Sequence, residues 1–324
     1  MQKLINISTY PGDLERFDRN SKNMEDFLRQ NGLQGFEMIQ YEPWEDHMIP
    51  GSLIKGVHMR YYPVWLDFWR GDQSQLLRQW GNRETIRRYY GGETREDMVA
   101  YYQREIETAA QTGAQYLVFH VSHAEVEHCF TYRFTYTDMD IAACTIELLN
   151  EVFQGYQGGL TLLLENLWWP GLTLKDQAVA GELMAGIRYP HKGFMLDIAH
   201  LMNTNFYLQN EEEAVAYILK TLEDLGALKK EIRGIHLNSS LSGDYVLEQL
   251  KKNRRQDFSM AAADYSEIYR HIRNIDQHRP FLDSKIKRVI EEIQPEYLVY
   301  EFLTKSLEEL KAFVAQQNRA LMDG

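Results

Sequence analysis

The sequence predicts an α/β fold, a single (β/α)8 barrel with long loops after the third and the seventh strands. Short apolar runs alternate along the chain with amphipathic helical segments, which is the pattern of parallel α/β folds. Most of these runs lack the alternation of polar and apolar residues, as expected for parallel strands that are buried on both faces. No Gly-, Ser- or Pro-rich linker interrupts the chain, so residues 1–324 are expected to form one domain. A doubly wound open sheet is the alternative arrangement of the same elements.

Eight segments are short, apolar and rich in β-branched or aromatic residues, and we predict that each is a strand. In chain order they are Leu4–Ser8, Gly35–Ile39, Ile54–His58, Tyr116–His120, Thr161–Glu165, Gly193–Asp197, Gly234–His236 and Tyr297–Glu301.

Helices are predicted between these strands from apolar residues at helical spacing. They are Arg95–Thr112, Asp138–Phe153, Leu174–Ile187, Glu211–Leu225, Lys285–Ile293 and Ser306–Gln317. Residues 60–94 are predicted to form a long loop after the third strand. An extra helical insertion at about residues 239–275, with one helix at Asp264–Asn274, precedes the eighth strand.

Composition excludes several classes of function. A formal charge of −12 disfavours DNA as a partner, because phosphate contacts need clustered Lys and Arg. No apolar run is long enough to cross a membrane, and the N-terminus does not have the pattern of a signal peptide, so a cytoplasmic location is expected. Two cysteines, Cys129 and Cys144, are too few for a disulfide framework and do not form a C-x-x-C pair.

The ends of the predicted strands carry ionisable residues that could bind a metal. Six strands in succession end in, or are followed at once by, His58, His120, Glu165, Asp197 with His200, His236, and Glu301. In a parallel barrel the C-terminal ends of all strands meet at one rim, so these side chains are expected to converge. Imidazole and carboxylate without thiolate suit Zn²⁺ or Mn²⁺. Each residue taken alone also has an ordinary explanation; Asp197, for example, could simply cap a helix.

Four short motifs are the most specific part of the pattern: Gly234-Ile235-His236-Leu237-Asn238, Asp197-x-x-His200, Glu165-Asn166 and Asp276-Gln277-His278. At these residues the chain resembles the endonuclease IV and xylose isomerase-like superfamily of TIM barrels, the AP endonuclease family 2-like proteins. The ligand pattern is most similar to that of the endonuclease IV branch, which implies a three-zinc cluster.

The resemblance implies three groups of ligands. His58, His120 and Glu165 would hold one ion, and Glu165 would bridge to a second ion shared with Asp197, His236 and Glu301. His200, Asp276 and His278 would hold the third. Two or three zinc ions are therefore expected, with Mn²⁺ or Mg²⁺ as the alternative cofactor.

The sequence departs from the endonuclease pattern in places. About forty residues separate His236 from Asp276, and Asp244 and Asp257 in the insertion are alternative ligands. Ser239 stands where the endonuclease pattern has Asp, and Glu37 is more similar to the sugar isomerase and epimerase branches. No arginine follows His236 closely, as it does in ketose epimerases.

Three functions are compatible with this pattern. The first is metal-assisted hydrolysis of a phosphate ester, with Glu165 or Glu301 orienting the attacking water. The second is isomerisation or epimerisation of a sugar or sugar phosphate, with the same two residues as acid and base. The third is a barrel without catalysis that binds a ligand.

A small phosphorylated or sugar-like molecule is the expected substrate. The residues expected to contact it are Tyr61, Tyr62, Asn166, Trp168, Asn238 and Glu37. All six tryptophans fall in predicted strand-to-helix loops, and at least two are expected to line the pocket. Arginines of the loop after strand three, among them Arg60 and Arg70, would either hold an anionic group or form surface ion pairs.

Overall fold

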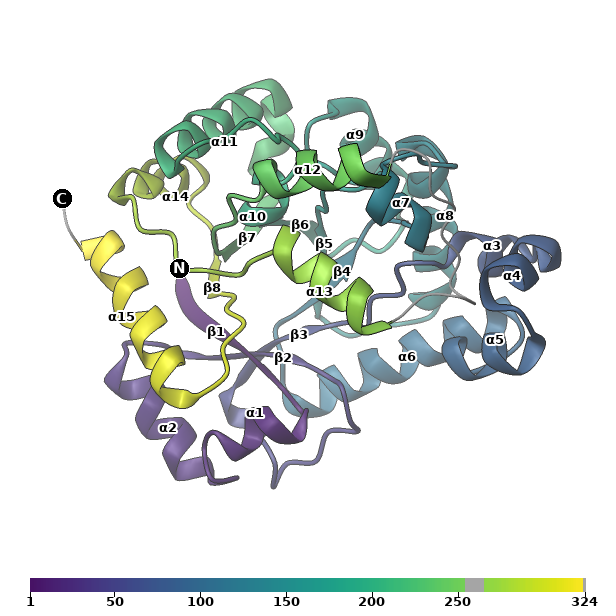
Figure 1. Ribbon diagram of the computed structural model, residues 1–324. Coiled ribbons are helices and arrows are strands. Elements are labelled where there is room, and N and C mark those ends of the chain that lie inside the picture. Colours follow the sequence, from purple (N-terminus) through teal and green to yellow (C-terminus); the bar gives the residue numbers. More distant parts are fainter. Residues whose placement is uncertain (254–264, 323–324) are drawn as a thin grey trace.

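A computed structural model describes residues 1–253 and 265–322 and confirms the predicted barrel. Eight parallel strands pair in chain order, and β8 pairs with β1 to close the sheet (Figure 1). The strands are β1 Gln2–Ser8, β2 Gly35–Ile39, β3 Ile54–His58, β4 Tyr116–His120, β5 Thr161–Glu165, β6 Lys192–Asp197, β7 Ile232–Leu237 and β8 Tyr297–Tyr300. Closure gives each of these strands a neighbour on both sides, and helices around the outside cover the apolar outer face.

The register between strands sets the rim residues side by side. His120 pairs with Glu165 across β4 and β5, and Asp197 pairs with His236 across β6 and β7. The strand β8 ends at Tyr300, one residue earlier than predicted, so Glu301 is the first residue beyond it. The chain positions that we predicted as strand ends therefore lie at one level of the barrel.

The helices of the outer layer include all six that were predicted, with small shifts of their ends, and two between β1 and β2, α1 and α2, that were not predicted. They are α1 Pro11–Glu15, α2 Ser21–Gln30, α6 Arg95–Thr112, α8 Asp138–Val152, α9 Gln177–Gly186, α11 Glu211–Leu225, α14 Lys287–Ile293 and α15 Leu307–Met322, with 3-10 turns at Gly51–Leu53, Gly226–Glu231 and Ser284–Ile286. Among the described residues, no helix is both long and apolar enough to span a bilayer.

The segment after β3 is not the irregular loop that we predicted. It forms α3 Leu66–Arg70, α4 Gln73–Trp80 and α5 Arg83–Tyr90. Gly71 and Gly81 end two of these helices with positive φ, and the residue after each glycine caps the next helix: Asp72 accepts from the backbone N–H groups of Ser74 and Gln75, and Asn82 from that of Thr85. The pairs Gly71-Asp72 and Gly81-Asn82 could have predicted these helices, because in each pair the glycine ends one helix and the next residue caps the following one.

Shorter helices lie on the C-terminal side of the barrel. They are α7 Val126–Thr131, α10 Ile198–Met202, α12 Gly243–Asn253 and α13 Tyr265–Ile275. The last two form the described part of the insertion before β8, and α13 matches the helix predicted at Asp264–Asn274 apart from Asp264, which lies outside the described residues. Figure 1 shows α12 and α13 in front of the strand ends.

The inside of the barrel is packed with side chains and is not a channel. Buried apolar residues from several strands, among them Leu4, Val118, Leu163 and Val299, form one cluster there with Tyr116. Gly56 on β3 makes room for the ring of Tyr116, because a Cβ at this glycine would lie 2.1 Å from Cζ of the tyrosine.

We expect Gly56→Ala to lower the free energy of unfolding by about 1–3 kcal/mol, because the added methyl group overpacks the barrel interior. Urea unfolding monitored by circular dichroism measures this change. Gly159→Ala is the control, since a Cβ there has no atom within 4 Å. Equal stability of the two variants would contradict the packing argument.

Candidate metal centre

Nine side chains named from the sequence meet at the C-terminal rim of the barrel. They come from β3, β4, β5, β6, α10, β7, the segment after α13 and the residue after β8: His58, His120, Glu165, Asp197, His200, His236, Asp276, His278 and Glu301. Among the described residues they form four overlapping groups whose ligand atoms lie within 4.8 Å of one another. Residues far apart in the chain therefore share one centre.

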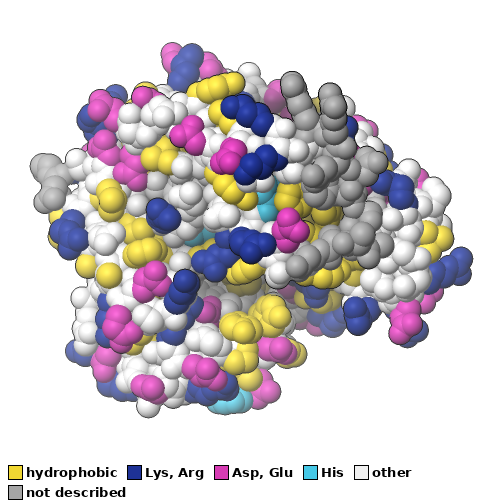
Figure 2. All heavy atoms as spheres, in the orientation of Figure 1, with side chains coloured by type: hydrophobic (Ala, Val, Ile, Leu, Met, Phe, Trp, Pro, Cys, Tyr) yellow, Lys and Arg dark blue, Asp and Glu magenta, His cyan; other side chains and the backbone are white. Residues whose placement is uncertain are grey.

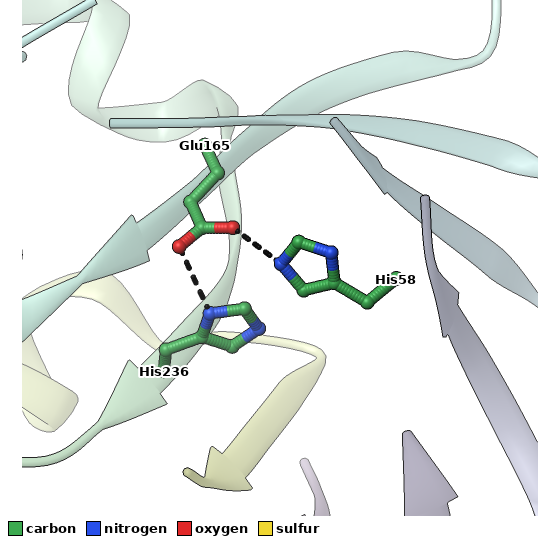
Figure 3. Close-up of side chains that lie close together, drawn as sticks. All are labelled: His58, Glu165 and His236. Atoms are coloured by element: carbon green, nitrogen blue, oxygen red, sulfur yellow. Dashed lines mark hydrogen bonds and ion pairs between the residues drawn. The ribbon is translucent and has the colours of Figure 1, made fainter. Parts of the chain in front are cut away.

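Glu165 is the central residue. Its side chain is fully buried, and Oε2 lies 3.0 Å from Nε2 of His58 and 3.3 Å from Nε2 of His120. Its other oxygen, Oε1, lies 3.2 Å from Nδ1 of His200 and 3.3 Å from Nδ1 of His236. Figure 3 shows one contact on each oxygen, with His58 and His236 pointing at opposite ends of the carboxylate. Both oxygens of Glu165 therefore face imidazole nitrogens, so this residue would be the one to bridge ions if more than one bound here.

The second group surrounds His236. Its Nδ1 lies 3.1 Å from Oε2 of Glu301 and 3.8 Å from Oδ2 of Asp197. The amide of Asn238 donates to both of these carboxylates, at 3.0 Å to Asp197 and 3.3 Å to Glu301. Asp197 also caps α10 through its other oxygen, which accepts from the backbone N–H of His200. The capping role and a place in the cluster therefore occur together.

The third group contains the late Asp-x-His pair. Oδ2 of Asp276 lies 2.6 Å from Nε2 of His278 and 3.3 Å from Nε2 of His200. His278 has a φ of +47°, a left-handed conformation that is uncommon for residues other than glycine. The insertion therefore does not displace the pair from the rim.

The two alternative ligands in the insertion are not part of this group. Asp244 lies exposed in the first turn of α12, outside the groups formed by the described residues. Asp257 lies outside the described residues.

Fixed acceptors orient four of the imidazoles. In three of them Nδ1 lies close to a backbone carbonyl oxygen. The distance is 3.0 Å from His58 to the carbonyl of Met59, 2.9 Å from His200 to the carbonyl of Asn166, and 3.3 Å from His278 to the carbonyl of Glu301. In each of these rings Nε2 faces a carboxylate. A ring that donates from one nitrogen presents the lone pair of the other, which is the state that a metal ligand needs.

Glu37 orients the fourth ring, that of His236, from inside the barrel. It is fully buried on β2, with Oε1 3.0 Å from Nε2 of His236, while Oε2 accepts a hydrogen bond of 2.7 Å from the hydroxyl of Tyr116. The sequence indicated contact between Glu37 and the substrate, but its carboxylate lies inside the barrel against His236. This position matches the carboxylate–histidine arrangement that fixes metal ligands.

The charges of the cluster shift the pKa values of its members. Burial opposes protonation of His58 and His278, but the carboxylates of Glu165 and Asp276 outweigh it and raise the pKa of each ring to about 9. Burial raises the pKa of Asp197 to about 8, opposed by His200 and assisted by the nearby carboxylates. Protons on imidazole rings therefore balance buried carboxylates, and divalent cations could take over that balance.

The aromatic and amide side chains expected to contact the substrate have different environments. The ring of Tyr61 lies 4.7 Å from that of His120, and the ring of Trp168 lies 5.0 Å from that of His200, so both flank the cluster. Tyr62 is instead buried in a group of tyrosines that includes Tyr89 and Tyr90.

The two asparagines are fully buried. Asn166 bonds to the backbone of Asp197 through both side-chain atoms, and Asn238 bonds to the backbone N–H of Ala199 and to carboxylates of the cluster. Both hold the rim in place.

The tryptophans and loop arginines mostly serve packing. Trp169 lies against Trp168, but Trp65, Trp69 and Trp80 belong to the main core. Arg60 lies over the ring of Tyr62, and Arg70 pairs with Asp140. Of these residues, Trp168 and its neighbour Trp169 are the ones that lie near the cluster.

A cavity of about 660 Å³ lies between the C-terminal ends of β1, β2 and β8 and the helix α13. Tyr10, Tyr41, Tyr269 and Arg273 line it, and we did not select them from the sequence. Tyr10 and Tyr41 follow strands β1 and β2 closely, so the rule that strand ends carry functional residues could have found them. The other two come from the insertion, for which no such rule exists.

A further group lies apart from the rim. Asp67, His123 and Glu125 are buried and have ligand atoms within 4.8 Å of one another. Nδ1 of His123 accepts from the backbone N–H groups of Trp65 and Leu66, so its proton sits on Nε2. A ring in this tautomer does not offer a lone pair toward the two carboxylates, which argues against a metal there.

Comparison with known proteins agrees with the fold. A solved structure described as AsfvAP:AG is 15% identical, with 98% of this chain and 97% of that chain covered and a TM-score of 0.54. D-psicose 3-epimerase in the presence of D-fructose is 11% identical, with 99% and 97% covered and a TM-score of 0.51. Endonuclease IV from Thermus thermophilus is 15% identical over 100% of both chains, with a TM-score of 0.49. At these identities the likeness to the first two structures shows the fold alone.

A search of curated protein sequences found no match. The family model described as xylose isomerase-like TIM barrel matches residues 77–284, a segment that carries all of the rim residues except His58 and Glu301 and more than half of the chain. The resemblance predicted from the strand ends is confirmed at this level: the chain belongs to the xylose isomerase-like TIM barrel family.

Proposed function

We propose that this chain is a metal-dependent hydrolase of a small phosphate ester, with a site for two or three divalent ions, zinc being favoured. The observation that carries the proposal is the complete set of nine rim residues, and above all the group of His200, Asp276 and His278. A site for one ion would not need this group. Its position beside Glu165 supports a cluster of ions.

The residues present fit such ions. Imidazole and carboxylate ligands suit zinc, and four rings already have one nitrogen at a fixed acceptor. Nδ1 of His120 and Oδ1 of Asp276 are buried without a hydrogen-bond partner among the described residues. Buried polar atoms are rarely left without a partner, so both indicate capacity for a ligand.

Two of the three groups implied by the family resemblance recur as side chains close together among the described residues, whereas His58 and His120 fall into separate groups, one with His236 and one with His200, that share Glu165. His58 and His120 share one oxygen of Glu165; Asp197, His236 and Glu301 surround the other; and His200, Asp276 and His278 complete the set. When bound, divalent ions supply Lewis acidity toward the phosphoryl oxygens and activate water for attack.

The protein's own groups would then position the reacting molecules. The side chains of His120, His278, Asp276 and Glu301 are 14%, 12%, 9% and 9% exposed, whereas Glu165 is fully buried. A substrate would thus approach from the side of these four residues. Glu301 is the carboxylate best placed to orient a water molecule, because Asn238 already fixes one of its oxygens.

A second candidate is a sugar isomerase or epimerase that uses one ion. The group of Glu165, Asp197, His236 and Glu301, which this reaction needs, is also present with ligand atoms within 4.8 Å of one another. Glu165 and Glu301 would be its acid and base. This reaction gives no role to Asp276 and His278, which is why we favour hydrolysis.

We expect His278→Ala to lower phosphodiesterase activity at least about 100-fold, since even a partner that only orients a metal ligand contributes about 10–100-fold. The measurements are turnover of bis(4-nitrophenyl) phosphate and the metal content of protein purified without added metal. The native chain should hold about three zinc ions, as a site built from nine such ligands allows. The variant should hold one ion fewer.

His191→Ala is the control, because His191 is exposed just before β6 at the other end of the barrel. Unchanged hydrolysis in His278→Ala would argue against the cluster of three ions. One manganese or magnesium ion per chain, together with epimerase activity that survives the same substitution, would favour the second candidate. Ligand binding without metal or turnover would indicate a barrel that only binds.

Glu37→Gln should weaken metal binding about 10–100-fold, because the ring of His236 loses the carboxylate that fixes it. The affinity is measured by competition with a chromogenic chelator, so that the result does not depend on turnover. The substitution preserves the shape of the side chain.

Glu105→Gln is the matched control, since this buried carboxylate accepts from the backbone N–H of Arg60 and not from a cluster histidine. If both variants bound metal as the native chain does, Glu37 would have no positioning role.

A further inference from the structure

The insertion before β8 is firmly attached over one half of the rim. Its residues Val246 and Ile275 pack with Phe130, Trp168 and Trp169 in a cluster separate from the main core. Helices α12 and α13 thus cover the loops that follow β4 and β5.

His271 on α13 is one anchor of the insertion. The hydroxyl of Tyr245 lies 2.8 Å from Nδ1 of His271, whose Nε2 lies 2.9 Å from the carbonyl oxygen of Cys129. The ring also stacks on Phe130 at 4.2 Å between centroids. A buried ring with both nitrogens bonded holds α13 in place against α7.

On the opposite side of the rim, the described residues at the ends of β1, β2 and β8 line a cavity together with α13. The cavity of about 660 Å³ lies there, and its volume is within the range of about 300–1,000 Å³ typical of small-molecule sites. Figure 2 shows this face hollowed between α13 and α1, with basic side chains along the α13 edge and hydrophobic ones opposite. The cavity is therefore large enough for a molecule of modest size.

The walls of the cavity are unusually aromatic. Tyr10, Tyr41 and Tyr269 are 51%, 68% and 61% exposed, and the rings of the first two meet edge to face with centroids 5.3 Å apart. Aromatic side chains this exposed make few apolar contacts with the rest of the protein, so the faces of their rings are available to a ligand. Three tyrosines around one cavity form a surface on which a flat ring can stack.

The cavity also offers a positive charge. Arg16 is paired with Asp13 and donates to Thr304 at 2.8 Å. By contrast, no carboxylate of residues 1–253 or 265–322 lies within ion-pair distance of Arg273, whose guanidinium is 5.7 Å from the ring centroid of Tyr269. An arginine beside an aromatic face is well suited to a phosphate attached to a ring system.

The cavity adjoins the candidate metal centre. Phe302, which lines it, directly follows Glu301 and exchanges two hydrogen bonds with the side chain of Asn6 on β1. Arg273 precedes Asp276 by less than one helical turn. The cavity and the cluster are therefore neighbours along the chain at two points, although none of the nine rim residues lines the cavity itself.

We propose that this cavity binds a nucleoside phosphate unit of the substrate, with the base among Tyr10, Tyr41 and Tyr269 and the phosphate at Arg273. The proposal rests on the proposed function, because it specifies the substrate class of that site. The covered half of the rim restricts this substrate to a small nucleotide-containing phosphoester.

The test is isothermal titration of the full chain with adenosine 5′-monophosphate, ribose 5-phosphate and adenosine. We expect the nucleotide to bind at least about tenfold more tightly than ribose 5-phosphate, which lacks the stacking ring. Tyr269→Ala should weaken binding of the nucleotide about tenfold and leave ribose 5-phosphate unchanged. Arg273→Gln should weaken binding of both phosphates and leave adenosine unchanged.

Tyr265→Ala and Arg270→Gln are the controls, because both residues are exposed on α13 and neither lines the cavity. Equal binding of nucleotide and ribose 5-phosphate would overturn the base site, as would equal effects of Tyr269→Ala and Tyr265→Ala. Equal effects of Arg273→Gln and Arg270→Gln would overturn the phosphate site.

The His278→Ala variant separates this proposal from the proposed function. Its affinity for adenosine 5′-monophosphate should stay within about threefold of the native value. That change is smaller than the loss of about tenfold expected when a stacking partner is removed. Nucleotide binding that depends on Tyr269 and Arg273, in a chain without hydrolase activity, would sustain the cavity and overturn the hydrolase. Hydrolysis without such binding would do the reverse.

Discussion

The rim of this barrel depends on the burial of Glu165. An isolated carboxylate transferred from water to a protein interior costs several kcal/mol, so a fully buried one needs close and numerous partners. Here the partners are the imidazoles of His58, His120, His200 and His236, two on each oxygen. These rings come from β3, β4, α10 and β7, so one carboxylate ties elements from around half of the barrel to a common point.

The strength of this arrangement comes from how the partners are themselves held. Strand register sets His120 beside Glu165, and carbonyl oxygens or Glu37 receive the outward nitrogens of the rings. Asn166 and Asn238 cross-link neighbouring strand ends through the Asp197 backbone and side chain. Four of the five imidazoles are thus oriented by the protein itself, which would reduce the reorganisation that binding of the proposed ions requires.

The sequence predicted the parts of the fold that depend on local pattern. Buried parallel strands are short and apolar, so β2 to β5 were located to the residue, and the ionisable residues at their ends stood out against apolar runs. The three helices after β3 were missed because their signal lies in Gly-Asp and Gly-Asn boundaries and not in a long apolar repeat.

The parts of the site that could not be predicted depend on three-dimensional placement. Whether the side chain of Glu37 faces the substrate or contacts His236 inside the barrel depends on how far along the barrel axis its position on β2 lies. Tyr62 differs from its neighbour Tyr61 only in the direction of its side chain. Tyr269 and Arg273 reach the cavity because α13 folds back over the rim, and no spacing in the sequence encodes that.

The two ends of the insertion are hydrogen-bonded next to the cluster, so an insertion of this length is compatible with Asp276 and His278 lying at the rim. The backbone N–H of Asp276 donates to the carbonyl oxygen of Ile272 at 2.8 Å, so the ligand continues the last turn of α13. Shortly after it, Arg279 pairs with Ser239 in both directions across a backbone bridge, so the chain returns to the end of β7. Both ends of the insertion are therefore fixed at the barrel. One helix therefore carries Arg273, which lines the cavity, and leads directly into Asp276 of the cluster, so the two proposed sites share a structural element.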